Sequence, residues 1–380
     1  MKTPEQLMIP GPTPLPDAVR EAMARPAIGH RGGEFKKVLE RVFPALQWVF
    51  QTQNDVFLIT ASGTAAMEAA MMNTLNAGDS ILVLSCGVFS ERWAETAELL
   101  GVRVTRQTVP YGQANSVESL RQALNEDRDK TFKAVVITHS ETSTSIQNPL
   151  KEMAALIRAH GALSIVDAVT SLTASPLPVD EWELDLVASG SQKGLMIPPG
   201  LSFLSVSPRA WEAFQRCERP GLYFNFKKYK KAQDDFTTPY TPATHLILAL
   251  DVALQMMLEE GLEACHARHL AHRDAIRNGA RALGLQLLVA DDALASAAVT
   301  AILPPQGVSV DDIRAALKKR FGIIVANGQK DLKGKIFRIG HLGFQSERDI
   351  RMTLDALKAV LADLGYCPEP TQRSGQALSV

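Results

Sequence analysis

Seven short apolar runs recur between residues 56 and 207, and segments with helical character separate most of them. The run at 134–138, Ala-Val-Val-Ile-Thr, lacks the apolar–polar alternation of a half-exposed strand, as expected of a strand covered on both faces. Strands that alternate with helices form mostly parallel sheets. The pattern therefore predicts a doubly wound α/β fold around a seven-stranded sheet. The seven runs span 56–60, 80–85, 103–109, 134–139, 163–168, 184–189 and 201–207.

The interval before the seventh run, residues 190–200, is too short for a crossover helix, so that strand is expected to be antiparallel. Beyond residue 208, residues 224–232 predict an exposed basic loop and residues 244–260 a long helix. The remainder predicts a smaller α+β domain, with helices at 264–283, 309–321 and 346–364 and strands at 298–303, 323–326 and 336–340.

Four parts of the chain are expected. Residues 8–16 contain four prolines and one glycine, which predicts a stiff extended arm that lies over another part of the molecule. We expect an arm over 1–20, a large domain over 21–255, a small α+β domain over 256–366 and a disordered tail over 367–380.

The charge balance excludes several classes of partner. The chain has 40 Lys and Arg against 41 Asp and Glu, a formal net charge of −1, which gives no general attraction for nucleic acid or an anionic membrane. No apolar run approaches the ~20 residues of a membrane span. Four widely spaced cysteines form no C-x-x-C pair, so neither a disulfide framework nor a metal site is expected. We therefore expect a cytoplasmic protein that acts on small molecules.

Lys193 follows the sixth run, where a strand ends in a loop. Ligands bind at such strand ends in open α/β sheets, and a lysine enclosed there can lose its proton and attack a carbonyl carbon. The residues around Lys193 fit a Schiff-base lysine and a surface lysine in a turn equally well.

Two further sites fall at strand ends. Residues 62–64, Ser-Gly-Thr, run into a helix after the first strand, which suits a phosphate cradle as well as an ordinary capped helix start. Asp167 ends the fifth strand, and one strand–crossover–strand step separates it from Lys193, so the two side chains should emerge side by side. A salt bridge would explain that pair. An amine, a carboxylate and a phosphate cradle together are what pyridoxal 5'-phosphate (PLP) requires.

These residues stand among motifs that resemble the class V aminotransferases of fold type I, in the alanine–glyoxylate and serine–glyoxylate branch. The resemblance runs from about residue 8 to 365. It also extends to a subgroup labelled small subunit of a soluble hydrogenase. The motifs are Ile-Pro-Gly-Pro-Thr-Pro at 9–14, Gly-His-Arg at 29–31, Ser-Gly-Thr at 62–64, Val-Asp-Ala-Val-Thr-Ser at 166–171, Ser-Gly-Ser-Gln-Lys at 189–193 and Phe-Arg-Ile-Gly at 337–340.

The resemblance implies a PLP-dependent enzyme that moves an amino group from serine or alanine to a small 2-oxo acid such as glyoxylate, by a ping-pong mechanism. Lys193 would hold the cofactor aldehyde, and Asp167 would pair with its ring nitrogen. Phe89 would stack on the ring and Val169 would line its other face. Thr142 would meet the phenolic oxygen. The phosphate would lie on Ser62, Gly63, Thr64 and Gln192.

The resemblance also implies a homodimer with shared sites, because Tyr240 and Thr241 match a segment that reaches the partner's phosphate. Arg338 would grip the substrate carboxylate, although by itself it would be expected on the solvent side of a strand. Ser145 stands where the family usually has glycine, which puts the local loop shape in doubt.

Several residues also allow other interpretations. His266, His269 and His272 could present imidazoles to a metal, but a polar helix surface explains them as well, and His139 with Glu141 suggests metal weakly. A lyase of the cysteine desulfurase kind would need a cysteine in 323–335, where none occurs. A hydrogenase-associated subunit without catalysis would need metal ligands or a docking surface.

Overall fold

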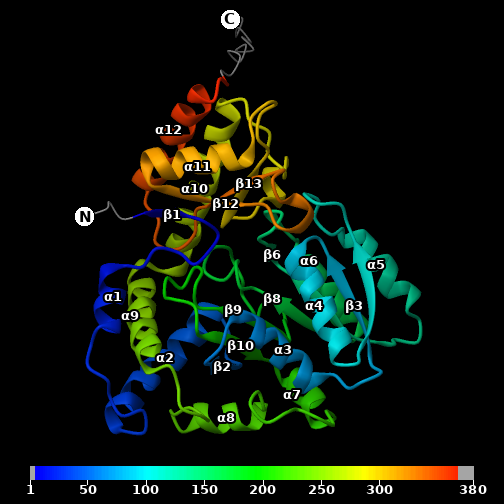
Figure 1. The fold of residues 1–380 in the computed structure, drawn as a ribbon. Helices are drawn as coiled ribbons and strands as arrows, with labels where there is room; N and C mark the ends of the chain where they lie inside the picture. The colour runs from blue at the N-terminus through cyan, green and yellow to red at the C-terminus, as the bar shows by residue number, and fades with distance from the viewer. Residues whose placement is uncertain (1–4, 367–380) are drawn as a thin grey trace, which may run out of the picture.

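The computed structural model describes residues 5–366 (Figure 1). Its main sheet has seven strands in the order β2-β10-β9-β8-β5-β3-β4. β10 runs antiparallel to both of its neighbours and the other neighbouring pairs are parallel, so the predicted antiparallel seventh strand is confirmed. The strands are β2 (Asp55–Ile59), β3 (Ser80–Ser85), β4 (Arg103–Thr108), β5 (Phe132–Thr138), β8 (Leu163–Asp167), β9 (Leu186–Gly190) and β10 (Ser202–Val206).

Helices cover both faces of this sheet, which explains the uninterrupted apolar runs. In β5, Val135 and Ile137 belong to one apolar core and Ala134 and Val136 to the other. The first core is completed by α2 (Gly33–Phe50), α5 (Val117–Glu126), α6 (Leu150–His160) and α9 (Thr244–Glu260). The second is completed by α3 (Gly63–Thr74), α4 (Val88–Leu99), α7 (Pro208–Gln215) and α8 (Phe226–Asp234).

A second, four-stranded sheet has the order β1-β12-β13-β11 and lies with three helices at the top of Figure 1. Its predicted helices and strands are all present within two residues of the expected bounds. They are α10 (Leu262–Ala282), β11 (Val299–Ile302), α11 (Val310–Phe321), β12 (Ile323–Asn327), β13 (Phe337–Gly340) and α12 (Glu347–Asp363). The predicted domain limits stay predictions, and the tail at 367–380 lies outside the described residues.

The amino-terminal arm joins the two sheets. β1 (Gln6–Met8), which the sequence did not predict, pairs parallel with β12, and Met8 is fully buried. After β1 the chain is irregular up to α1 (Asp17–Met23), which packs against α9. The arm thus begins in the small sheet and ends on the large one.

The prediction of an exposed basic loop at 224–232 was wrong. The segment forms α8, with Phe226, Tyr229 and Ala232 buried. These three residues follow at three-residue intervals, so they form one apolar stripe while the lysines face outward. Because lysines dominate the segment, its sequence was interpreted as an exposed loop, whereas it forms a helix that covers the edge strand β2.

The expectation of a polar surface around His269 and His272 was also wrong, because these side chains are 1% and 3% exposed. His269 Nδ1 contacts the Cys265 carbonyl at 2.6 Å, and His269 Nε2 accepts a hydrogen bond from Gly343 N at 2.9 Å. The imidazole therefore ties α10 to the loop after β13. Over residues 5–366, no group of three or more His, Cys, Asp or Glu side chains is arranged to hold a metal ion.

None of the helices within residues 5–366 combines the length and apolar character that crossing a bilayer requires. The cytoplasmic location stays a prediction.

Candidate active site

One cavity of about 120 Å³ gathers nine of the twelve site residues predicted from the sequence. It lies at the carboxyl ends of β2, β8 and β9, the edge at which parallel sheets bind ligands. The nine are Ser62, Gly63, Thr64, Phe89, Thr142, Asp167, Val169, Gln192 and Lys193. Three lining residues were not predicted: Arg92, Trp93 and Thr170.

Lys193 is buried, so the interpretation as a surface lysine was wrong. Its side chain is only 9% exposed, and Nζ donates to the carbonyl oxygen of Pro10. Burial, assisted by the nearby charge of Arg338, lowers the pKa of Lys193 to about 8. Roughly a tenth of this amine is therefore uncharged at pH 7, far more than for an ordinary lysine, and the uncharged form is the one that attacks a carbonyl.

The proline-rich arm lies over this lysine. Thr13 N donates to the Gln192 carbonyl at 3.2 Å, and Thr13 Oγ1 donates to the Lys193 carbonyl at 3.1 Å. Gly11 has φ +134°, and a Cβ there would lie 2.8 Å from Lys193 Nζ. Only glycine combines that backbone angle with so close an approach. The arm therefore packs directly on Lys193, although none of its described residues lines the cavity.

Asp167 lies at the end of β8 and is 5% exposed. Its Oδ1 accepts from Val169 N at 2.8 Å and its Oδ2 accepts from Trp93 Nε1 at 2.9 Å. Burial raises the pKa of Asp167 to about 6, against the effect of these hydrogen bonds. No ion pair joins Asp167 to Lys193 in the described part of the chain, so the salt-bridge alternative does not account for the two residues.

The amino terminus of α3 faces the cavity. The first N–H groups of an α-helix have no acceptor within the helix, and the Ser62 side chain makes no cap bond to them. A Cβ on Gly63 would lie 2.8 Å from Val169 Cγ2, so glycine lets the helix start pack closely against that side chain. Gln192 Oε1 is buried with no hydrogen-bond partner among the described residues. The free N–H groups at the start of α3 can receive an anion, whereas Gln192 Oε1 can only accept a hydrogen bond.

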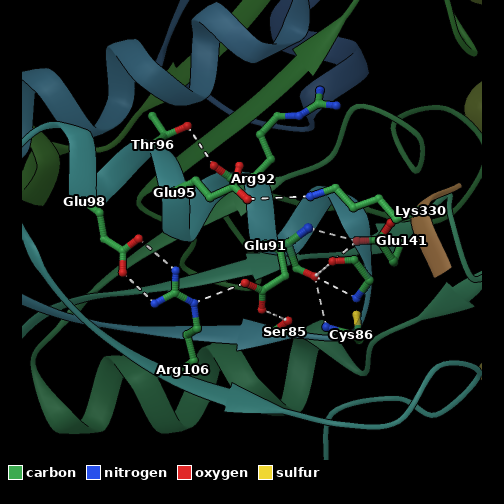
Figure 2. Close-up of polar contacts among 12 residues, drawn as sticks. Ser85, Cys86, Glu91, Arg92, Glu95, Thr96, Glu98, Arg106, Glu141 and Lys330 are labelled. Atoms are coloured by element: carbon green, nitrogen blue, oxygen red, sulfur yellow. Dashed lines mark hydrogen bonds and ion pairs between the residues drawn. The ribbon is translucent and has the colours of Figure 1, made fainter.

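The first turn of α4 is held by a buried carboxylate that the sequence did not single out for this purpose. Glu141 is fully buried, and its Oε2 accepts from Phe89 N at 3.0 Å and from Ser90 N at 2.9 Å. Ser143 Oγ accepts from Val88 N at 2.9 Å. Figure 2 shows Glu141 among the polar side chains around α4. A carboxylate at a helix amino terminus is stabilising, and this one fixes the helix that carries Phe89.

Arg92 comes from the same helix. Its guanidinium lies 4.7 Å from the centroid of the Phe89 ring, and Nη1 is 3.4 Å from Thr64 Oγ1. It therefore places a positive charge beside the amino terminus of α3. On the outer side of α4, Arg106 pairs with Glu91 and Glu98, as Figure 2 shows.

Arg338 lies beside the cavity residue Thr142 and does not line the cavity itself. It is 5% exposed, so the expectation of a solvent-facing arginine was wrong. Nη1 donates to the Thr142 carbonyl at 2.9 Å, and Nε and Nη2 donate to the Asn327 carbonyl at 3.0 and 2.8 Å. Burial lowers the pKa of Arg338 to about 10. The guanidinium keeps further N–H groups for an acceptor outside these contacts.

Tyr240 and Thr241 do not reach the cavity of their own chain. They border a separate hollow with Tyr223, whose ring stacks on that of Tyr240 with centroids 4.8 Å apart. The Tyr240 hydroxyl donates to the Leu222 carbonyl at 2.6 Å, and Leu222 is 70% exposed. The loop that carries Tyr240 and Thr241 is thus at the surface.

The loop after β5 takes the shape that glycine favours even though it carries Ser145. Ser145 has φ +64° and is 1% exposed, and its hydroxyl has no partner among the described residues. Thr142 keeps its place on the cavity, with Oγ1 2.6 Å from Thr170 Oγ1. The unusual residue therefore leaves the predicted hydroxyl in position.

The chain matches known proteins over most of its length. The family model Aminotransferase class-V matches residues 11–340. A "Soluble hydrogenase, small subunit" from Synechococcus sp. (strain PCC 6716) is 49% identical, over 96% of this chain and 95% of the relative. The serine–glyoxylate aminotransferase of Methylorubrum extorquens is 35% identical, over 96% and 92%. The solved structure of ureidoglycine–glyoxylate aminotransferase from Bacillus subtilis has a TM-score of 0.91 at 30% identity, covering 98% of this chain and 96% of that one.

Proposed function

The chain belongs to the class V aminotransferases, whose cofactor is PLP, and we propose that it moves an amino group from serine or alanine to glyoxylate. The family, the fold and the cofactor expected from the sequence are confirmed. The amino donor and the acceptor are inferred from relatives named for glyoxylate, among them the serine enzyme already described.

One observation supports the assignment of the site: Asp167, Lys193 and the amino terminus of α3 line a single cavity. PLP needs an amine for its aldehyde, an anion for its ring nitrogen and donors for its phosphate. Lys193 supplies the amine, Asp167 the anion and residues 62–64 the donors. The N–H groups at the start of α3 receive no side-chain cap from Ser62, so they are donors that an anionic ligand would satisfy. The residues present therefore fit the cofactor.

When bound, PLP supplies an electron sink that stabilises negative charge at the substrate Cα. The protein must orient the substrate and move one proton. Lys193 is placed to take the Cα proton and return it, because its lowered pKa leaves a free amine. Asp167 would stabilise the protonated form of the ring nitrogen. Arg338 would bind the substrate carboxylate and set the angle of the Cα–H bond.

A donor panel tests this function. The purified protein, loaded with PLP, should form glycine from glyoxylate with serine or alanine as donor, and the Lys193→Ala protein should not. A protein that binds PLP and transfers an amino group from neither donor to glyoxylate or pyruvate would contradict the proposed substrates. If the protein transferred an amino group from a different amino acid, the reaction class would stand and only the proposed donor would change.

The relative named as a hydrogenase subunit suggests a second interpretation, a non-catalytic partner of another enzyme. The chain retains the buried lysine, aspartate and arginine that amino transfer uses, which favours catalysis. The comparison of parental and Lys193→Ala proteins also decides between these two interpretations.

We further propose a homodimer in which Tyr240 and Thr241 complete the partner's phosphate site. Their place outside their own cavity and the exposed Leu222 beside them support this. Mixing Lys193→Ala chains with Tyr240→Phe/Thr241→Ala chains would put both defects in one site and leave the other intact. Activity should therefore return on mixing. If the two inactive variants exchange chains but recover no activity on mixing, the proposal of a site shared between subunits is wrong.

A further inference from the structure

Trp93 contacts the buried carboxylate of the proposed cofactor site. It is 1% exposed, and its indole N–H donates to Asp167 Oδ2 at 2.9 Å. The other carboxylate oxygen accepts from Val169 N at 2.8 Å. Both Trp93 and Asp167 line the cavity. Each oxygen therefore has one fixed donor and retains capacity for another contact.

An indole N–H and a backbone N–H can only donate, so both fixed contacts need Asp167 oxygens that accept. A protonated carboxyl would give up part of that accepting capacity. The two contacts thus favour the ionised form and oppose the burial that raises the pKa of Asp167. They also fix the plane of the carboxylate.

The position of Trp93 follows from the helix that carries it. Phe89 and Trp93 are four residues apart on α4 and both line the cavity, as expected of side chains on one helix face. Glu141 binds the first turn of α4 through Phe89 N and Ser90 N. One buried carboxylate therefore sets the place of both aromatic side chains.

We propose that Trp93 is a positioning residue, which holds Asp167 ionised and oriented toward the ring nitrogen of bound PLP. This inference rests on the proposed function. Trp93 acts through Asp167, so its expected effect is on the proton of the ring nitrogen and on cofactor affinity.

Other groups around Asp167 also bear on its charge. Glu141, from the strand after β5, raises the pKa of Asp167, and Lys193, from the loop after β9, lowers it. Arg92 lines the same cavity. His139 precedes Glu141, and its burial lowers its pKa to about 4, so this imidazole stays neutral above pH 5. A measurement between pH 5 and 9 therefore needs a control for changes that do not involve Trp93.

The chain offers a matched control. Trp211 Nε1 donates to Asp55 Oδ2 at 2.9 Å, the same contact at the same distance, away from the cavity. Trp93→Phe and Trp211→Phe each remove one indole donor from one aspartate. The dissociation constant of PLP is measured from pH 5 to 9 for both variants and the parent. The protonation of the ring nitrogen is followed by NMR with PLP labelled with ¹⁵N.

Trp93→Phe should weaken PLP binding ~10-fold, because a hydrogen bond to a charged group is lost. The acid limb of PLP binding should move up by about one pH unit, and, as pH rises, the ring nitrogen should lose its proton at a lower pH than in the parent. Trp211→Phe should leave all three quantities at the parental values. Should Trp93→Phe fold poorly, β-(3-benzothienyl)alanine at position 93 keeps the bicyclic shape and removes only the donor.

Equal affinities and equal pH profiles for the parent and the Trp93 variants would overturn the inference. So would equal shifts in the Trp93 and Trp211 variants, since these would reflect general loosening of the fold. A parent that bound no PLP would overturn the proposed function as well, whereas a parent that binds PLP as tightly as Trp93→Phe would overturn the role of Trp93 alone.

Discussion

Two buried clusters of titratable side chains differ in one respect, because only one of them surrounds a cavity. The first is the cavity with Asp167 and Lys193. The second, here called the α10 cluster, consists of His269, His272 and Arg277 on α10 together with His341, all at most 3% exposed. Burial shifts pKa values in both: it lowers that of Lys193 to about 8 and that of His269 to about 3.

The surroundings of the buried groups separate the two regions. In the α10 cluster, both nitrogens of His269 contact backbone atoms, Arg277 pairs with Asp292 at 2.5 Å, and His341 Nε2 contacts Thr300 Oγ1 at 3.0 Å. In the cavity, the groups face open space beside a helix amino terminus. A shifted pKa therefore marks a candidate site only where open space and converging donors accompany it.

The largest expected effect comes from removing the amine. Lys193→Ala should lower kcat by on the order of 10⁴-fold, because the proton carrier at the substrate Cα is lost. His269→Gln in the α10 cluster should keep kcat within about threefold at a temperature where it is folded, since His269 touches no cavity residue in its hydrogen bonds. Steady-state kinetics with matched PLP content measure both. A comparable loss in the two variants would remove the distinction between the regions.

The next effect compares two buried arginines. Arg338 donates to backbone carbonyls and has no ion-pair partner within residues 5–366, whereas Arg277 is paired with Asp292. Arg338→Lys keeps the charge and loses the planar fork, so kcat/KM should fall ~100-fold for every amino-acid donor while PLP stays bound. Arg277→Lys should lower the unfolding midpoint and leave kcat/KM unchanged. Parental turnover by Arg338→Lys would end its assignment to the substrate carboxylate.

The sequence was most informative where burial was continuous. Every strand of the large sheet was predicted within two residues at each end. The central strands, such as β5, are covered on both faces and therefore stand out as apolar runs. β1 was missed because three residues beside a proline-rich arm carry too little pattern. α8 was missed because lysines outnumber its apolar residues.

The site was predictable only where a motif marked it. Residues 62–64, Asp167 and Lys193 stand at strand ends, which the sequence displays. Trp93 and Glu141 serve the site through contacts that join positions 74 and 52 residues apart. Nothing local distinguishes Trp93 from a core tryptophan, and Glu141 resembled a weak metal ligand. Such roles depend on contacts between residues far apart in the sequence, and no local sequence pattern indicates these contacts.

The two regions should also affect stability with opposite signs at acid pH. His269 has its pKa lowered to about 3, so between pH 6.5 and 3 the unfolded chain binds a proton that the folded chain refuses. Stability therefore falls as pH drops below about 6.5 and is flat above it. Asp167 has its pKa raised to about 6, so between pH 6 and 3.8 the folded chain binds the extra proton and stability rises as pH falls.

Urea unfolding of the cofactor-free protein at pH 7.5 and 5.5 measures this difference. From its shift alone, His269 should account for about 1.4 kcal/mol of the loss between these two pH values. His269→Gln should reduce the loss, and Asp167→Asn should increase it by a smaller amount. If His269→Gln leaves the loss unchanged, the histidine is not buried in its neutral form.

The smallest expected effect concerns backbone strain, which also distinguishes the regions. Ser145, Thr173 and Met196 have positive φ near the cavity, whereas three of the four residues of the α10 cluster lie on a regular helix. At Ser145 the left-handed backbone and a buried hydroxyl without a described partner both disfavour the folded state. Ser145→Gly relieves both, against the greater flexibility of glycine in the unfolded chain, so it should raise the free energy of unfolding by about 1 kcal/mol.

Lys130 provides the control for that substitution, because it has φ +50° at an exposed position. Lys130→Gly relieves the backbone alone, so its gain in unfolding free energy should be smaller than that of Ser145→Gly. Equal gains would show that the Ser145 hydroxyl costs nothing and is satisfied in solution. A loss on Ser145→Gly would show that the serine side chain supports the loop that presents Thr142, and kcat should then fall together with stability.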